Sequence, residues 1–405
     1  MKIKLPIFIL IALLACVAAI AFIIWGVPYF LDTSLPAPTN AGMGSETVTA
    51  QIIQVNDSGT ITLGTTTQAY QDFTVQLLEG QYKGREIEVS YGQYEIEPAG
   101  ITFKPGDQIL VTPAIKPDGT LTANYTDAVR VKPILLLLGV FIAALLAVAR
   151  WKGLRSLLAL AFSFLVVIGY IIPHIIHGED PVKVSIIGSL ILLVVTLYLT
   201  YGWNVKTHAS VLSVLVVLLL TGVLAGLFAK VAYLTGNGDE NALYLMQIPG
   251  ITIDLRGLLL GGMIIGALGV LDDLIITQAS AVFELREANP ALGLRQLYQK
   301  AYNIGQDHVA STVNTLVMAY TGVALPMLLL FALERGDYSQ LVNIASVAEE
   351  IVRTLVGSVG LIAAVPISTF IATLLALYSD RLGALRPYLG PENGEEEGHS
   401  HSGAA

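Results

Sequence analysis

Two adjacent carboxylates, Asp272 and Asp273, lie within a long apolar stretch of the sequence. Ionisable side chains inside a membrane span are costly and are therefore candidates for function. Thr277 follows on the same predicted helix face, which also carries three glycines suited to close helix packing, Gly262, Gly266 and Gly269. Because neighbouring carboxylates in a low-dielectric site cannot both ionise easily, we expect one of them to bind and release a proton or a sodium ion.

The depth of this pair can be estimated from the helix rise. Asp272 lies 16 residues beyond Arg256, or about 24 Å along a helix, which places the pair in the inner third of a bilayer. The alternative is that the helix leaves the membrane earlier, so that both carboxylates lie in cytoplasmic water.

The start of the next apolar segment weighs against that alternative. It carries hydroxyl and amide groups at a similar depth, on Ser311, Asn314 and Thr315. If the two helices are antiparallel neighbours, these groups lie close to Asp272 and Asp273 and could help to bind an ion. Hydrogen bonding between helices would be an equally good role for them.

The last apolar segment begins with two charged residues, Glu349 and Arg353, spaced as i and i+4. This spacing predicts a structural ion pair near the outer interface. Gly357 and Gly360 follow and predict close packing against a neighbouring helix.

The sequence carries no signature of an enzyme, a metal site or a cofactor. A phosphate loop, a zinc-binding His-Glu-x-x-His helix and a nucleophile elbow are all missing from it. The histidines His174 and His177 lack a third ligand, and one cysteine excludes a disulfide framework. We therefore expect no catalysis, no bound metal and no cofactor.

The composition identifies the surroundings of these residues. The 405 residues are 54% hydrophobic and 13% charged, whereas soluble chains are about 25% charged. Much of the surface must therefore contact lipid, and the bilayer is the main predicted partner. The net charge of -9 gives no basic surface for a nucleic acid.

The chain is expected to be a polytopic α-helical membrane protein. An apolar run needs about 20 residues to cross a bilayer, and about eight segments qualify. They are roughly Leu5 to Phe30, Pro133 to Ala149, Leu154 to Ile172, Val184 to Tyr201, Ala209 to Tyr233, Leu255 to Val282, Val309 to Leu333 and Glu349 to Tyr378.

The distribution of lysine and arginine predicts the orientation of these spans. With the N-terminus inside, eleven of these residues fall in cytoplasmic segments and five in the opposite loops. The positive-inside rule then places both termini in the cytoplasm. Four regions follow: an anchor at 1–31, an extracytoplasmic region at 32–132, seven helices at 133–380 and a disordered cytoplasmic tail at 381–405.

The region 32–132 differs from the rest in composition. A linker at 35–44 precedes six short runs of alternating polar and apolar residues, separated by turn sequences such as Asn56-Asp57-Ser58-Gly59. These runs predict a small all-β domain after the first helix, a barrel or sandwich of the oligonucleotide/oligosaccharide-binding type. It shows no ligand-binding constellation, and we expect it to be a folding module or a docking platform for an envelope protein.

Several motifs resemble the YibE/F family of bacterial multi-pass membrane proteins. They are Gly266-Ala267-Leu268-Gly269-Val270-Leu271-Asp272-Asp273, Asn303-Ile304-Gly305-Gln306-Asp307, Thr312-Val313-Asn314-Thr315-Leu316 and Ile351-Val352-Arg353-Thr354-Leu355-Val356-Gly357-Ser358-Val359-Gly360. The resemblance implies a bacterial cell-membrane protein with an anchor and a small extracytoplasmic domain. Members of the family often carry one acidic residue at the position of the pair, which favours Asp272 as the shared group.

A second resemblance concerns mechanism. Gly269-Val270-Leu271-Asp272-Asp273 is similar to the Gly-x-x-x-Asp-Asp motif of resistance-nodulation-division transporters and of Sec accessory subunits, with its glycine one residue closer. This likeness implies ion coupling through the carboxylates. The leading hypothesis is therefore a transporter, or a transport-assisting protein, that couples a proton or sodium ion to movement of an unknown solute. The alternative is a non-transporting scaffold whose β-domain recruits a partner.

Overall fold

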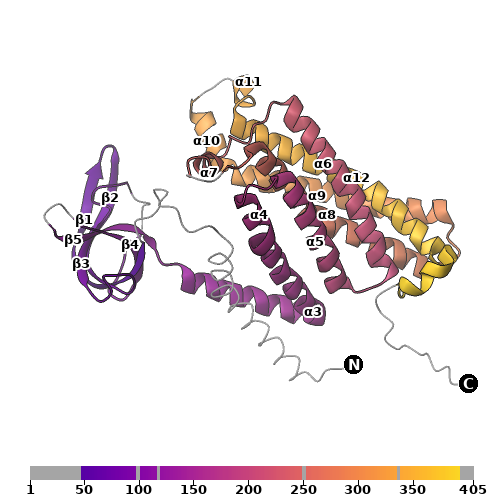
Figure 1. Ribbon diagram of the computed structural model, residues 1–405, viewed down its shortest axis with the longest axis horizontal. Helices are drawn as coiled ribbons and strands as arrows, with labels where there is room; N and C mark the ends of the chain where they lie inside the picture. Colours follow the sequence, from indigo (N-terminus) through magenta and orange to yellow (C-terminus); the bar gives the residue numbers. More distant parts are fainter. Residues whose placement is uncertain (1–46, 97–100, 116–118, 249–251, 335–337, 393–405) are drawn as a thin grey trace, which may run out of the picture. The chain divides into compact units, whose positions relative to one another are not determined.

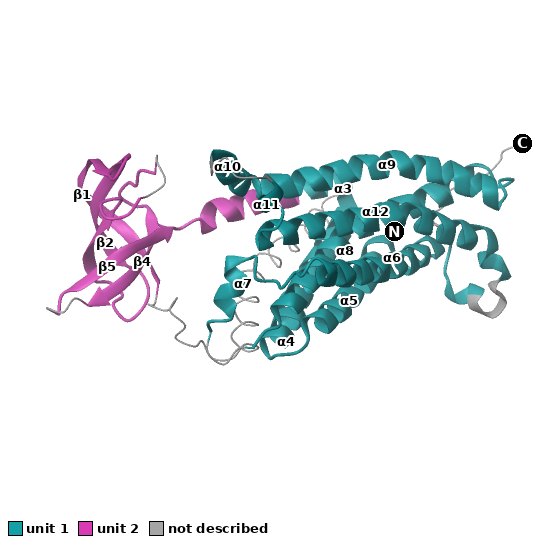
Figure 2. Cartoon of the chain, turned by 90° about the horizontal axis from the view of Figure 1, so that it is seen from above, with its two compact units in different colours: residues 1–37, 144–405 teal, residues 38–143 magenta. Residues whose placement is uncertain are grey.

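The computed structural model describes residues 47–96, 101–115, 119–248, 252–334 and 338–392. These residues fall into two compact units, a helical unit within 144–405 and a second unit within 38–143 that holds all the described strands (Figure 2). The predicted anchor at 1–31 and the linker at 35–44 lie outside the described residues.

The second unit contains an antiparallel sheet of five strands. Its strands are β1 (Val48–Leu63), β2 (Thr66–Leu77), β3 (Glu86–Tyr91), β4 (Gln108–Ile115) and β5 (Leu121–Ala128), in the order β3-β2-β1-β4-β5. The two outer strands, β3 and β5, also approach each other, so the sheet curls into a small, partly open barrel (Figure 1). The prediction of a small all-β domain is confirmed, whereas its assignment to the oligonucleotide/oligosaccharide-binding type stays a prediction.

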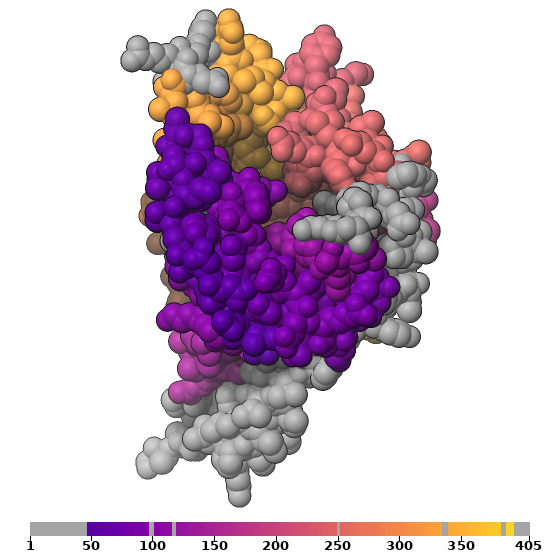
Figure 3. Space-filling view, turned by 90° about the vertical axis from the view of Figure 1, so that its left-hand side faces the viewer, coloured from indigo at the N-terminus to yellow at the C-terminus, as the bar shows by residue number. Residues whose placement is uncertain are grey.

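Alternation of side chains along the strands produces the core of this β-domain. Phe73, Val75 and Leu77 of β2 are buried, and the polar residues between them, Thr74 and Gln76, are more exposed. Tyr91 lies edge-to-face with Phe103 and Tyr125, at centroid distances of 5.2 and 4.8 Å. Such aromatic contacts stabilise a core beyond the area that they bury. The outer surface of the domain is drawn in indigo to purple in Figure 3.

One predicted turn is wrong. Asn56-Asp57-Ser58-Gly59 does not reverse the chain, and the two runs on either side of it form the single strand β1. The register against β2 shifts twice, between Ile52 and Gln54 and between Val55 and Asp57. Bulges of this kind accept extra residues and bend a strand without ending it. The chain reverses instead at Gly64, whose φ of 62° favours glycine.

The first helical stretch comprises α3 (Val131–Val166), η2 (Val167–Ile171) and α4 (Ile172–Ile176). Arg150 breaks α3 with φ 48° and ψ -121°. A Cβ built on Gly153 would lie 2.8 Å from the carbonyl oxygen of Leu145, whereas eight residues of straight helix span about 12 Å. The chain therefore reverses where the sequence places the loop between its second and third predicted spans.

The other helices form a bundle. They are α5 (Pro181–Tyr201), α6 (Val205–Val231), α7 (Glu240–Leu245), α8 (Leu255–Ala288), α9 (Leu294–Val323), α10 (Leu325–Glu334), α11 (Tyr338–Leu341) and α12 (Ala345–Tyr378). Five described helical stretches are long and apolar enough to cross a membrane, or six if α9 and α10, bent by 62°, form one span. The mostly helical, membrane-type architecture is confirmed, whereas the number eight stays a prediction.

Polar side chains define where three of these helices begin. Asp180, Asn204 and Asp254 precede α5, α6 and α8, and each side chain accepts a hydrogen bond from a backbone N–H of the first turn. These N–H groups have no partner within the helix, so a capping oxygen stabilises the helix start.

Small residues form the interface between α6 and α12, which lie side by side (Figure 2). Buried positions recur every four residues on both helices: Ala209, Ser213, Val217, Thr221 and Ala225 on α6, and Gly360, Ala364, Ser368, Ala372 and Ala376 on α12. The hydroxyls of Ser213 and Thr221 donate to carbonyls of their own helix, at 2.6 and 2.8 Å. The two backbones can therefore approach closely without an unsatisfied hydroxyl at these two positions.

The segment after α12 is described up to residue 392, and here it differs from the disordered tail predicted from residue 381. Residues Ser379–Tyr388 form the helix η3. The backbone N–H of Val205 donates to Pro391 O at 3.0 Å, and Trp203 Nε1 donates to Tyr388 O at 2.7 Å. The Pro391 carbonyl thus satisfies a backbone donor at the start of α6, where the helix itself offers no acceptor, and the Tyr388 carbonyl satisfies the indole N–H of Trp203. Residues 393–405 lie outside the described residues.

Candidate functional site

Helix α8 carries the predicted site and contacts α5, α6, α9 and α12. Asp254 caps its start, and Leu271, Leu274 and Ile275 bury its central part against the other helices. The carboxylates of Asp272 and Asp273 therefore project from a helix whose position is fixed on several sides.

Asp272 is half-buried, and one of its two carboxylate oxygens lacks a hydrogen-bond partner among the described residues. This atom, Oδ1, is buried. The flanking side chains of Leu271 and Leu274 are only 1% exposed and offer no donor. A buried carboxylate oxygen without a partner is unfavourable, because the free energy lost with its hydration is not recovered. Binding of a proton or a small cation would remove that penalty.

Asp273 follows Asp272 in the sequence and is exposed. Both carboxylates interact electrostatically with Tyr201, the last residue of α5. The Cβ positions of Gly257 and Gly261 face Pro181 and Ser185 respectively, so α5 and α8 run in the same direction. Eleven residues beyond Gly261, Asp272 is level with about residue 196, or about 8 Å inside the end of α5.

The three glycines, Asp273 and Thr277 share one face of α8, as predicted, but the close helix packing predicted for the glycines of this face is not found at all of them. Gly262, Gly266, Gly269, Asp273 and Thr277 all lie on one exposed face. A Cβ on Gly262 or Gly269 would meet no atom within 4 Å, and one on Gly266 would lie 3.9 Å from the Tyr320 hydroxyl. Among the described residues, no helix therefore packs closely against Gly262 or Gly269.

Close approach does occur at other glycines, among them Gly360 and Gly261. A Cβ on Gly360 would collide with the Thr221 hydroxyl of α6, and one on Gly261 would collide with the Ser185 hydroxyl of α5. Gly357 makes an ordinary contact, with Leu316 at 3.8 Å. The predicted packing role is therefore present at Gly360, while Gly261 was not predicted.

The polar groups of α9 are not brought to Asp272. Ser311, Asn314 and Thr315 are exposed, and the Thr315 hydroxyl donates to Ser311 O at 3.0 Å. The buried face of α9 follows Leu297, Ala301 and Gly305, so Asn314 falls on the opposite side of the helix. In the described part of the chain, no hydrogen bond links these groups to either carboxylate.

The predicted ion pair between Glu349 and Arg353 is wrong. Glu349 is buried, and its Oε1 accepts hydrogen bonds from the backbone N–H groups of Gly236 and Gly238, at 2.9 and 3.3 Å. Arg353 Nη1 instead donates to Glu350 Oε2 at 2.9 Å. Spacings of three and four residues are both compatible with an ion pair on a helix. Because the backbone of the loop before α7 donates hydrogen bonds to Glu349, Arg353 pairs with Glu350.

Arg353 borders a small cavity between α8, α9 and α12. Two of the predicted packing glycines, Gly266 and Gly357, line it together with Leu316 and Tyr320. Arg353 Nε is buried there without a hydrogen-bond partner among the described residues. The cavity thus places a charged group of α12 beside the glycine face of α8.

A polar contact that the sequence analysis missed joins three helices. Gln278 of α8 is 1% exposed, and its Nε2 donates to Ala301 O at 2.8 Å and to Thr369 Oγ1 at 2.7 Å. A Cβ on Gly305 would lie 2.6 Å from Gln278 Oε1. An amide within an apolar run, facing small residues on another helix, is the signal that could have revealed it.

The histidines considered as metal ligands bond to their own helix. His174 Nδ1 lies 2.7 Å from Tyr170 O, and His177 Nδ1 lies 2.6 Å from Pro173 O. Within the ranges that the structure describes, no three His, Cys, Asp or Glu side chains are grouped as metal ligands would be. The carboxylates on α8 therefore remain the principal candidate for ion binding.

Comparison with known proteins identifies the family of the helical unit. A family model described as YibE/F-like protein matches residues 137–377, which include Asp272, Gln278 and Glu349. No curated protein and no solved structure matches the chain. Because the family match covers more than half of the chain, the protein belongs to the YibE/F-like family.

Proposed function

We propose that this protein is an ion-coupled transporter, or a transport-assisting membrane protein, in which Asp272 binds and releases a proton or a sodium ion. The observation that carries the proposal is the buried Oδ1 atom of Asp272, which has no partner among the described residues. Its ionised form is costly in apolar surroundings, so the bound and unbound states should favour different local packing. A change in packing driven by ion binding is what coupling requires.

Asp273 and Thr277 have a different role in this proposal. Both are exposed on the same face of α8, next to the half-buried Asp272. A carboxylate at this position attracts a cation electrostatically, and a hydroxyl can replace part of its hydration. Asp273 and Thr277 would therefore guide the ion, and Asp272 would hold it.

The proposed topology has eight spans, with both termini in the cytoplasm of a bacterium and the β-domain outside its cell membrane. The reversal at Arg150 and the break between α9 and α10 are compatible with it. Cys16 is the single cysteine, so a Cys16→Ser background allows a clean test. Tyr94→Cys should react with a membrane-impermeant maleimide in intact cells, and Arg295→Cys should react only after lysis. The reverse pattern would overturn the orientation.

Infrared difference spectra between acidic and neutral pH test the role of Asp272 directly. We expect a carbonyl band from a protonated carboxyl group that is lost in Asp272→Asn and retained in Asp273→Asn. If sodium is the coupling ion, its addition at constant pH should remove the same band. A spectrum unchanged in Asp272→Asn, together with full activity of this variant in a deletion strain, would overturn the proposal.

A further inference from the structure

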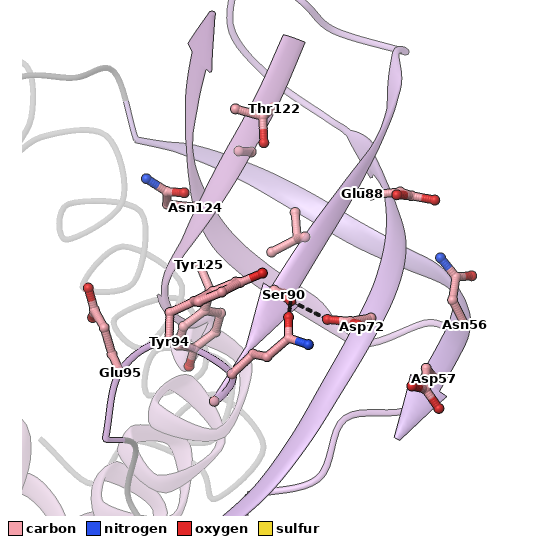
Figure 4. A pocket seen from close by; sticks show the side chains of 14 residues that line it. Asn56, Asp57, Asp72, Glu88, Ser90, Tyr94, Glu95, Thr122, Asn124 and Tyr125 are labelled. Atoms are coloured by element: carbon pink, nitrogen blue, oxygen red, sulfur yellow. Dashed lines mark hydrogen bonds between the residues drawn. The ribbon is translucent and has the colours of Figure 1, made fainter. Parts of the chain in front are cut away.

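An open groove of about 760 Å³ crosses the outer face of the β-domain. Four strands and the segment after β3 form its walls: Asn56 and Asp57 from β1, Asp72 from β2, Glu88 and Ser90 from β3, Tyr94 and Glu95 after it, and Thr122 and Asn124 from β5. Figure 4 shows Ser90 and Asp72 between Tyr94 on one side and Asn56 and Asp57 on the other. The volume is in the usual range of ligand sites.

All the charged side chains that line the groove are negative. Its lining residues include four carboxylates, on Asp57, Asp72, Glu88 and Glu95, and no Lys, Arg or His. Asp57 accepts a hydrogen bond from Tyr70 at 2.9 Å, and Asp72 accepts one from Ser90. The carboxylates of Glu88 and Glu95 make no hydrogen bond or ion pair within the described residues. A concave surface with this negative potential favours a cationic ligand.

An anchored aromatic residue stands at the edge of the groove. Tyr94 is 80% exposed, yet hydrogen bonds hold the backbone on both sides of it in place. The buried Gln68 side chain donates to Gly92 O and to Glu95 O, both at 2.6 Å. The Tyr94 ring is therefore presented at a defined position, where its face can contact a cation or an alkyl chain.

The groove also runs along two strand edges. β3 and β5 are the outer strands of the sheet, and although they approach each other where the barrel closes, in the described residues no ladder of hydrogen bonds joins them. Unpaired strand edges offer backbone donors and acceptors to an added extended chain. This feature distinguishes a peptide from a saccharide as the occupant.

We propose that this groove binds an extended peptide segment of a partner protein that carries lysine or arginine side chains. The basic side chains pair with Glu88 and Glu95, the aromatic ring of Tyr94 contacts their alkyl parts, and the peptide backbone lies along the groove between these groups. This proposal stands independently of ion coupling in the helical unit.

Binding of a defined probe to the full-length protein in nanodiscs tests the inference. The probe is a fluorescent peptide of alternating lysine and valine, followed by anisotropy. We expect Glu88→Gln combined with Glu95→Gln to weaken binding about threefold to thirtyfold, since each exposed charge pair contributes little by itself. Added salt should weaken binding in the same direction, because it screens the charges.

Two controls make the result decisive. Glu86→Gln neutralises an exposed carboxylate of β3 that does not line the groove, and it should leave the affinity within about twofold. The same peptide with acetylated lysines has lost its charge and should bind to the unmodified protein about tenfold more weakly or worse. This comparison uses no protein variant, so it does not depend on how a variant folds. Equal binding of both peptides would overturn the proposal, as would preferential binding of a neutral oligosaccharide.

Discussion

The Nε2 atom of Gln278 on α8 donates a hydrogen bond to the Thr369 hydroxyl of α12 over 2.7 Å. The same nitrogen donates to Ala301 O of α9 at 2.8 Å. Both side chains are almost completely buried. This amide thus connects the helix that carries Asp272 to two of its neighbours. It fixes the spacing of the three helices six residues beyond Asp272 along α8.

Replacing Gln278 with leucine should destabilise the helical unit by about 1–3 kcal/mol, because the Thr369 hydroxyl and the Ala301 carbonyl lose a buried partner. Thermal unfolding in detergent measures the effect. Thr277→Val alters the adjacent exposed residue and should change stability by less than about 0.5 kcal/mol. In a double-mutant cycle, Gln278→Leu and Thr369→Val should show a coupling of about 0.6–2 kcal/mol. Strict additivity would contradict the interaction.

Gly305 should tolerate no side chain. An added Cβ would lie 2.5 Å from Val365 Cγ1 and 2.6 Å from Gln278 Oε1, so Gly305→Ala should cost about 1–3 kcal/mol through overpacking. Gly262→Ala provides the matched control, since its Cβ would meet nothing within 4 Å. There the higher helix propensity of alanine should stabilise α8 by up to about 1 kcal/mol. Melting temperatures that move in the same direction for both variants would contradict this packing.

The sequence predicts individual helix faces better than it predicts their neighbours. Gly262, Gly266, Gly269, Asp273 and Thr277 share a face because helical periodicity alone determines it. Which helix covers that face depends on the packing of the whole bundle, which local spacing does not encode. Gln278 was missed for this reason, since it lies away from that face and its partners are on α9 and α12.

Local turn and pairing signals failed where a longer-range contact competed with them. Asn56-Asp57-Ser58-Gly59 has the composition of a turn, yet pairing with β2 continues through it. Glu349 and Glu350 were both available to Arg353, and the backbone of Gly236 and Gly238 engages the first. Propensity and spacing are weak preferences that tertiary contacts override.

Glu349 should control the loop before α7. Glu349→Leu removes the acceptor for the N–H groups of Gly236 and Gly238, and hydrogen bonds to a charged group contribute about 1.5–3 kcal/mol. We therefore expect hydrogen exchange of these amides to accelerate roughly tenfold to a hundredfold. Glu350→Gln breaks the ion pair with Arg353 and should leave their exchange unchanged. Equal acceleration in both variants would show that the loop depends on the charge of this region as a whole.

The segment after α12 should be released by one added methyl group. Gly390 has a φ of 69°, and a Cβ there would lie 2.6 Å from the Trp203 carbonyl oxygen. Gly390→Ala should therefore separate this segment from the start of α6, and the Val205 amide, which donates to Pro391 O at 3.0 Å, should exchange faster. Gly178 has a similar φ of 87° but no atom near its Cβ position. Gly178→Ala imposes comparable backbone strain of about 1 kcal/mol without that collision, so exchange at Val205 should stay unchanged.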